Sequence, residues 1–167
     1  MRSAKPFRRG AVPVVCALGL ALAGCGSSSQ AASHSSSTTT TTNSQTLSQR
    51  YTTVVSDGDK ELQSLSTQLN SAKGNVVEIQ AGFKAVSATY QSVAKAVQAL
   101  PFPASMHNDV TAMVAALNKL TADTSLGAQS VTTTQFDSVF SQLATDQKAE
   151  VAANNKVNHD LGISSIN

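Results

Sequence analysis

The chain has 167 residues, a net charge of +2, and charged side chains at only 13% of its positions. Four of its twelve basic side chains lie before residue 10 and all ten acids follow residue 25. The chain beyond residue 25 therefore has eight basic and ten acidic side chains, a net charge of −2. This balance excludes the basic surface that a nucleic-acid partner requires.

The first 24 residues have the pattern of an export signal. Residues 1–10 include four basic side chains and no acid, and residues 11–24 are apolar or small. A helix of that apolar length would rise about 21 Å, which is short of the roughly 30 Å hydrocarbon core of a membrane. We therefore expect residues 1–24 to be a cleaved signal peptide.

The apolar run closes on Leu22-Ala23-Gly24-Cys25, which resembles the lipobox of bacterial lipoproteins. The resemblance implies that the signal peptidase recognises residues 22–24 and cuts before Cys25. It also implies that the Cys25 sulfur receives a diacylglycerol and that the new N-terminus is acylated, for example with palmitate. The expected location is the outer face of the bacterial cytoplasmic membrane, or the outer membrane in a Gram-negative organism.

Residues 25–45 form the next expected unit, a tether behind the acylated cysteine. From Gly26 to Gln45 the sequence is rich in Ser and Thr and has neither a charged nor a large apolar side chain. Such a segment cannot bury enough apolar surface to offset its conformational entropy. We expect a disordered coil that spans about 25 Å, long enough to hold a folded domain away from the lipid headgroups.

From residue 46 onward, apolar residues recur every three or four positions, the period of amphipathic helices. Four stripes are present: Leu47, Tyr51, Val54, Gly58, Leu62, Leu65, Leu69 and Ala72; Val76, Ile79, Phe83, Val86, Tyr90, Val93, Val97 and Leu100; Met106, Val110, Met113, Leu117 and Leu120; and Phe136, Phe140, Leu143, Val151, Val157 and Leu161.

Helix stop and start signals separate these stripes. Gly74 ends the first helix, and Asn75 is the expected N-cap of the second, with Glu78 as its partner. Prolines at 101 and 103 separate the second and third helices, and a glycine at 127 ends the third. Thr132 and Gln135 predict a capping box for the fourth helix, which a glycine at 162 ends. Short connections favour antiparallel neighbours, so residues 46–167 predict an all-α, up-down-up-down four-helix bundle.

Catalytic motifs are absent from the sequence: it has no nucleophile elbow, phosphate-binding glycine loop or metalloprotease motif. We expect neither an enzyme nor a bound cofactor. A weak metal candidate is the pair His107 and His159, which an antiparallel bundle would bring to the same end, where they could bind Zn²⁺ or Cu²⁺. Solvent-exposed histidines at helix ends are the alternative.

The stripe of the fourth helix is interrupted by polar residues. Continuing the phase of Leu143 gives Gln147, Glu150 and Asn154 before apolar residues resume at Val157. Polar side chains at such positions fix helix register, mark an exposed helix end, or line a small polar pocket or a partner face.

The function that these features favour is a membrane-anchored envelope lipoprotein whose bundle is a non-enzymatic binding or scaffold module. Its expected partners are the membrane, through Cys25, and another envelope protein. The alternative is a carrier of a metal, haem or small molecule inside the bundle. Polar groups that converge in the bundle interior would favour that alternative.

Overall fold

The computed structural model describes residues 45–72 and 74–163. Within these ranges the chain is helical and has no strand, which confirms the all-α class. No helix of the described part combines the length and the hydropathy needed to cross a membrane. The expected signal peptide, the lipobox and nearly all of the expected tether lie outside the described residues.

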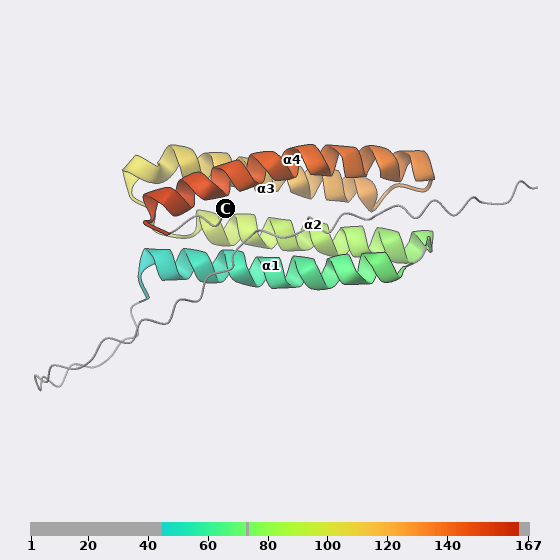
Figure 1. Cartoon of the computed structure of the whole chain (residues 1–167), viewed down its shortest axis with the longest axis horizontal. Coiled ribbons are helices and arrows are strands. Elements are labelled where there is room, and N and C mark those ends of the chain that lie inside the picture. Colours follow the sequence, from blue (N-terminus) through green and yellow to red (C-terminus); the bar gives the residue numbers. More distant parts are fainter. Residues whose placement is uncertain (1–44, 73, 164–167) are drawn as a thin grey trace, which may run out of the picture.

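Four long helices make a four-helix bundle (Figure 1). They are α1 (Leu47–Ser71), α2 (Val76–Gln98), α3 (His107–Gly127) and α4 (Thr133–Asp160), and a short 3₁₀ helix, η1 (Ala104–Met106), precedes α3. The closest backbone packing joins α2 to α3, α3 to α4, and α1 to α2, whereas α1 and α4 approach each other less closely. Side chains therefore make most of the contact between α1 and α4.

The predicted helix caps are present. The Asn75 side chain accepts hydrogen bonds from the backbone at the start of α2, and its Nδ2 donates to Glu78 Oε1 at 2.8 Å. Thr132 and Gln135 form the expected capping box of α4. A further capping box, which was not predicted, joins Thr46 and Gln49 at the start of α1. Each cap satisfies backbone N–H groups that the first helical turn leaves unpaired.

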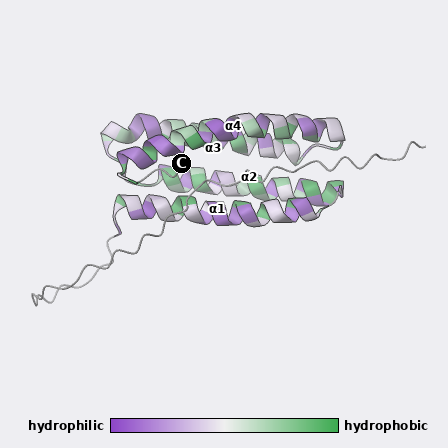
Figure 2. Cartoon of the chain, in the orientation of Figure 1, coloured by the Kyte–Doolittle hydropathy of each residue, from purple (hydrophilic) through white to green (hydrophobic). Residues whose placement is uncertain are grey.

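The core lies along the inner stripes of the four helices, and Figure 2 shows hydrophobic and hydrophilic residues alternating along each helix. The largest fully buried side chains are Tyr51, Phe83, Leu62, Met113, Leu117 and Leu120. The Phe83 ring stacks on Phe136, with a centroid separation of 6.0 Å. Most of the predicted stripe residues are buried, which confirms the helical period.

Three stripe positions differ from the prediction. In α1, Val55 is fully buried and its neighbour Val54 is only half-buried. In α4, Val151 is 42% exposed, and at the start of α2, Val76 is 37% exposed. Val151 faces outward because the phase that buries Leu143 and Val157 places Glu150 inside the bundle.

The connections between helices gather at two ends of the molecule. The chain passes from α1 to α2 and from α3 to α4 at one end, and from α2 to α3 at the other (Figure 1). The beginning of α1 and the end of α4 share the end with the α2–α3 connection. We call this the proximal end, since the described part of the chain begins here, and we call the opposite end the distal end.

Candidate functional site

The inner face of α4 is polar between Leu143 and Val157. Asp146, Glu150 and Asn154, four residues apart, are all buried, and Glu150 and Asn154 are only 3% and 5% exposed. Gln147 is half-buried. Two of the three predicted pocket residues thus lie fully in the bundle interior, rather than at an exposed helix end.

A hydrogen bond joins this face of α4 to α1. The hydroxyl group of Tyr51 donates to Asn154 Oδ1 at 2.6 Å, and both side chains are buried. The Tyr51 ring also meets Phe102 edge-on, with a centroid separation of 6.0 Å. This bond ties α1 to α4 where their backbones are further apart than those of the other neighbouring helices.

Glu150 has no basic partner to balance its charge. Its Oε1 atom is buried and has no hydrogen-bond partner among the described residues. Burial, followed by the negative charge of Asp59 on α1, raises the pKa of Glu150 to about 8. Both carboxylate oxygens of Asp59 are also shielded from solvent. In the absence of a cation, the Glu150 carboxyl group is therefore protonated at neutral pH.

Two phenol groups lie close to these carboxyl groups. Burial is the largest cause that raises the pKa of Tyr51 and Tyr90 above the ordinary range, and the charges of Glu150 and Asp59 raise both further. A hydrogen bond with Gln147 acts in the opposite direction on Tyr90. Both phenols therefore stay neutral and keep their hydroxyl protons at neutral pH. We call Tyr51, Asp59, Tyr90, Gln147, Glu150 and Asn154 the interior polar cluster.

A second pair of acids lies between α3 and α4. Asp123 and Asp146 are both buried, and Gln142 Nε2 donates to Asp146 Oδ2 at 3.2 Å. Burial, a hydrogen bond shared with Asp146 and the charge of Asp146 raise the pKa of Asp123 to about 6. This pair is a second place where acidic side chains are buried inside the bundle.

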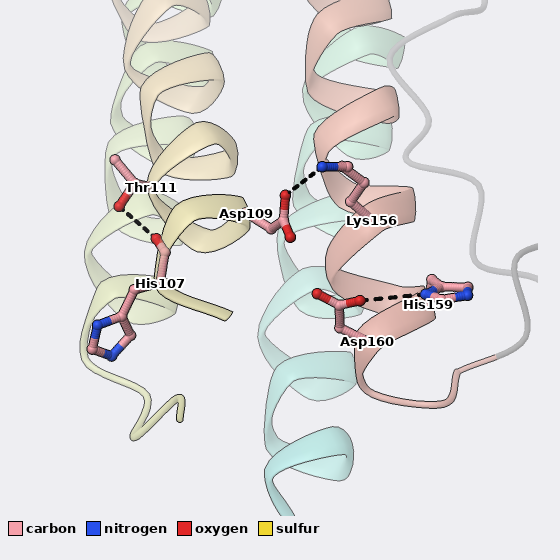
Figure 3. Close-up of polar contacts among 6 residues, drawn as sticks. All are labelled: His107, Asp109, Thr111, Lys156, His159 and Asp160. Carbon is pink, nitrogen blue, oxygen red and sulfur yellow. Dashed lines mark hydrogen bonds and ion pairs between the residues drawn. The ribbon is translucent and has the colours of Figure 1, made fainter. Parts of the chain in front are cut away.

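The structure does not bring the two predicted histidine ligands together. His107 and His159 are exposed at the proximal end, and their rings point away from each other (Figure 3). His159 Nδ1 lies 3.3 Å from Asp160 Oδ1. Between the two histidines, an ion pair links α3 to α4, with Lys156 Nζ 2.7 Å from Asp109 Oδ1. No group of three or more His, Cys, Asp or Glu side chains able to hold a metal ion occurs in the described part of the chain.

The distal end exposes apolar side chains. Val77 is 73% exposed, and Leu126 and Val131 are also exposed together with Val76. Gln80 Nε2 donates to the backbone oxygen of Ser130 at 2.8 Å, which holds the start of α2 beside the α3–α4 connection. We call Val76, Val77, Leu126 and Val131 the distal apolar patch.

Tyr51, Tyr90, Asp123 and Asp146 are not among the predicted site residues. The apolar stripes place both tyrosines in the core, although a buried phenol also needs a polar partner. Asp146 is signalled by its spacing, because it follows Leu143 by three positions and precedes Glu150 by four. Asp59 directly follows the buried Gly58 and belongs to a short acidic run, residues 57–61, which by itself is typical of a solvated helix face.

No family model matches this chain, and neither a curated protein nor a solved structure matches it. The functional assignment therefore depends on the chemistry of the sites described above. The interior polar cluster offers carboxylate, amide and phenol oxygens, and the distal patch offers apolar contact area.

Proposed function

We propose that the protein is a lipid-anchored envelope lipoprotein that displays its bundle as a non-enzymatic binding module. Its support is the lipobox-like Leu22-Ala23-Gly24-Cys25, which follows a basic segment and an apolar run. In this proposal, residues 1–24 are removed and Cys25 holds the chain on the outer face of the cytoplasmic membrane. Residues 25–45 then form the tether.

A serine in place of the cysteine tests the anchor. Cys25→Ser removes the sulfur that would receive the lipid, so a radiolabelled or clickable fatty acid should no longer be incorporated. The variant should also leave the membrane fraction. A variant that stays in the membranes and is labelled like the wild type would overturn the anchoring proposal. Cys16→Ser, within the apolar run, is the matched control and should change neither result.

We infer that the helices run up-down-up-down in an antiparallel bundle. The short connections and the packing of consecutive helices support this arrangement. It separates the two ends of the domain by the length of a helix of more than 20 residues, which is about 30 Å. The distal apolar patch would then face away from the membrane.

The main support for a binding module is the exposure of the apolar residues in the distal apolar patch. In this proposal, the four exposed apolar side chains of the distal end form one contact surface, which is typical of protein interaction sites. Val77 and Val131 are both more than half exposed, and the hydrogen bond from Gln80 to Ser130 holds their segments side by side. The patch suits an apolar surface of another envelope protein.

Site-specific photocrosslinking in intact cells tests this contact. A photoreactive residue at Val77 should give one discrete crosslinked band, because the patch would be covered by a defined partner. The same probe at Asn108, which is exposed at the proximal end, is the control and should not give that band. Equal crosslinking from both positions would contradict a specific contact at the distal end.

The second candidate function is a carrier that holds its ligand inside the bundle. The histidines do not support it, because both are exposed. The interior polar cluster does, because Glu150 has a buried oxygen without a hydrogen-bond partner and faces a second acid across the bundle. A buried charged group of this kind needs a counter-charge or a proton.

A further inference from the structure

Acidic side chains are buried inside the bundle, whereas basic side chains are not. In the described part of the chain, Asp123, Asp146 and Glu150 are buried, and no lysine, arginine or histidine is. Charged side chains are almost never fully buried unless they are paired. Glu150 is the most deeply buried of the three acids, with 3% of its surface exposed. The bundle therefore closes around carboxyl groups that have no buried base to balance them.

Glu150 lies where the protein does little to stabilise a negative charge. Its Oε1 atom is shielded from solvent and has no hydrogen-bond partner among the described residues. A carboxylate that is buried without a counter-charge binds a proton instead. Closing the bundle around Glu150 should therefore take up a proton from the solvent.

The titratable groups that act on Glu150 from other helices add no positive charge. The charge of Asp59 on α1 raises the pKa of Glu150 further, after the effect of burial. The neutral phenols of Tyr51 on α1 and Tyr90 on α2 also interact with it. The buried acid of α3, Asp123, pairs with a second acid on α4. Ionisation of Glu150 would thus add a negative charge that none of these groups balances.

The contact between α1 and α4 is where an opening would cost least. Their backbones approach each other less closely than those of consecutive helices. The hydrogen bond from Tyr51 to Asn154 crosses this contact, one helical turn from Glu150. Separation of α1 from α4 would therefore let water reach Glu150, while α2 and α3 stay packed together.

We propose that Glu150 is a pH-dependent switch that controls the contact between α4 and α1. With its proton, the carboxyl group is neutral and α4 packs against α1. When the proton leaves, the carboxylate draws in water and the two helices separate locally. This inference goes beyond the binding module and depends on neither the lipid anchor nor the distal apolar patch.

The direction of the effect follows from the protons that each state holds. In the folded state the pKa of Glu150 is raised from 4.5 to about 8, so the closed state keeps a proton that the open state releases. The stability that this group contributes is complete below pH 4.5 and is lost as the pH rises through 8. The pKa of Asp123 is about 6, so between pH 6.5 and pH 8 the change comes mainly from Glu150.

Amide hydrogen exchange of the full chain, purified in detergent, tests the switch at pH 6.5 and pH 8. Division by the intrinsic exchange rates gives the opening constant of each helix. In the wild type this constant should rise roughly tenfold in α1 and α4 between the two pH values, and should change little in α2 and α3. Glu150→Gln introduces an amide of the same size that cannot ionise, and should abolish the rise.

Two control variants and one measurement on the wild type support the comparison. Glu61→Gln makes the same chemical change at an exposed position of α1, and Asp123→Asn removes another buried acid. Both variants should keep the rise in α1 and α4. Urea unfolding of the wild type at the same pH values should show the release of close to one proton, a result that does not require Glu150→Gln to fold.

Equal opening constants at the two pH values in the wild type would overturn the proposal. A rise that persists in Glu150→Gln would overturn it as well, because another group would then be the one that titrates. Equal acceleration in all four helices would refute a local opening between α1 and α4. None of these outcomes bears on the lipid anchor or the distal contact, which the Cys25→Ser variant and the photocrosslinking at Val77 test.

Discussion

Gly127 lies where α3 comes close to the rigid ring of Phe83. A Cβ atom at this position would lie 2.6–2.9 Å from three atoms of the ring, which is itself stacked on Phe136. Gly127→Ala should therefore destabilise the bundle by about 1–3 kcal/mol, the cost of overpacking a core. Urea unfolding followed by circular dichroism measures the change.

Gly82→Ala is the matched control for this substitution. Its Cβ would contact the end of the Leu69 side chain, which can rotate away more easily than an aromatic ring. Part of the cost is also offset, because alanine favours a helix interior by roughly 1 kcal/mol over glycine. A larger loss of stability at Gly82 than at Gly127 would contradict this account.

Asp123 makes the stability of the bundle depend on pH. Its pKa is raised from the ordinary 3.8 to about 6, so the folded state binds the proton more tightly than the unfolded state. This contribution to stability is complete below pH 4 and is lost as the pH rises through 6. At about 1.4 kcal/mol for each pKa unit, the loss is up to roughly 3 kcal/mol.

The free energy of unfolding at pH 4 and pH 7 checks this sign. Asp123→Asn should remove part of the fall in stability that the wild type shows between these values, since the amide cannot ionise. Asp137→Asn, an exposed acid at the start of α4, should leave the fall unchanged. Identical pH dependence in the wild type and in Asp123→Asn would show that the Asp123 carboxyl group is not perturbed.

The contact between α1 and α4 depends on Tyr51. Tyr51→Phe removes the hydroxyl group and leaves Asn154 Oδ1 buried without that donor, at a cost of about 1–3 kcal/mol. Amide hydrogen exchange should then rise in α1 more than in α3. Thr53→Ala, at an exposed position on the same helix, is the control. Uniform acceleration in all four helices would instead indicate that the bundle opens only as a whole.

The capping box of α4 offers a second test at a helix boundary. Thr132→Ala removes the side chain that accepts from Gln135 N and should cost about 1 kcal/mol of stability. Thr133→Ala changes a neighbouring exposed threonine that makes no capping bond and should cost much less. Thermal unfolding of the two variants gives the comparison. Equal melting temperatures would contradict the role of the cap.

Helix boundaries were predictable because glycine, proline and capping residues act locally. Asn75 and Thr132 cap the helices as their side-chain chemistry requires. The choice between Val54 and Val55 was not predictable, because adjacent apolar residues give the same local signal and only packing against other helices selects one. The prediction that Val151 belongs to the buried stripe of α4 was also wrong. It was based on hydropathy, whereas the buried stripe continues through the polar Glu150 and Asn154.

The candidate site was predictable only on its α4 side. The stripe phase identified Glu150 and Asn154, because both lie a whole number of turns from apolar core positions. Their partners Tyr51 and Asp59 come from α1, about 100 residues away, and no local pattern records that pairing. The histidines show the opposite case. A shared end of the bundle was not enough to make a site, because helix phase directs both rings into solvent.

Taken as a whole, the domain has two distinct places for contact, an interior polar cluster and a distal apolar patch. The described part of the chain begins at the proximal end (Figure 1), so a lipid anchor that precedes it would leave the distal patch displayed away from the membrane. A coil of about 25 Å between anchor and domain would let the patch reach partners at a range of heights and orientations. This arrangement would suit the proposed binding module.

Intact mass spectrometry of the protein purified from membranes tests the lipid-anchored module most directly. The account predicts a chain that begins at Cys25, lacks residues 1–24 and carries the added mass of a diacylglycerol. A second acyl chain would add a further defined mass at the amino group. An unmodified Cys25, or a chain that begins at any other residue, would contradict the account.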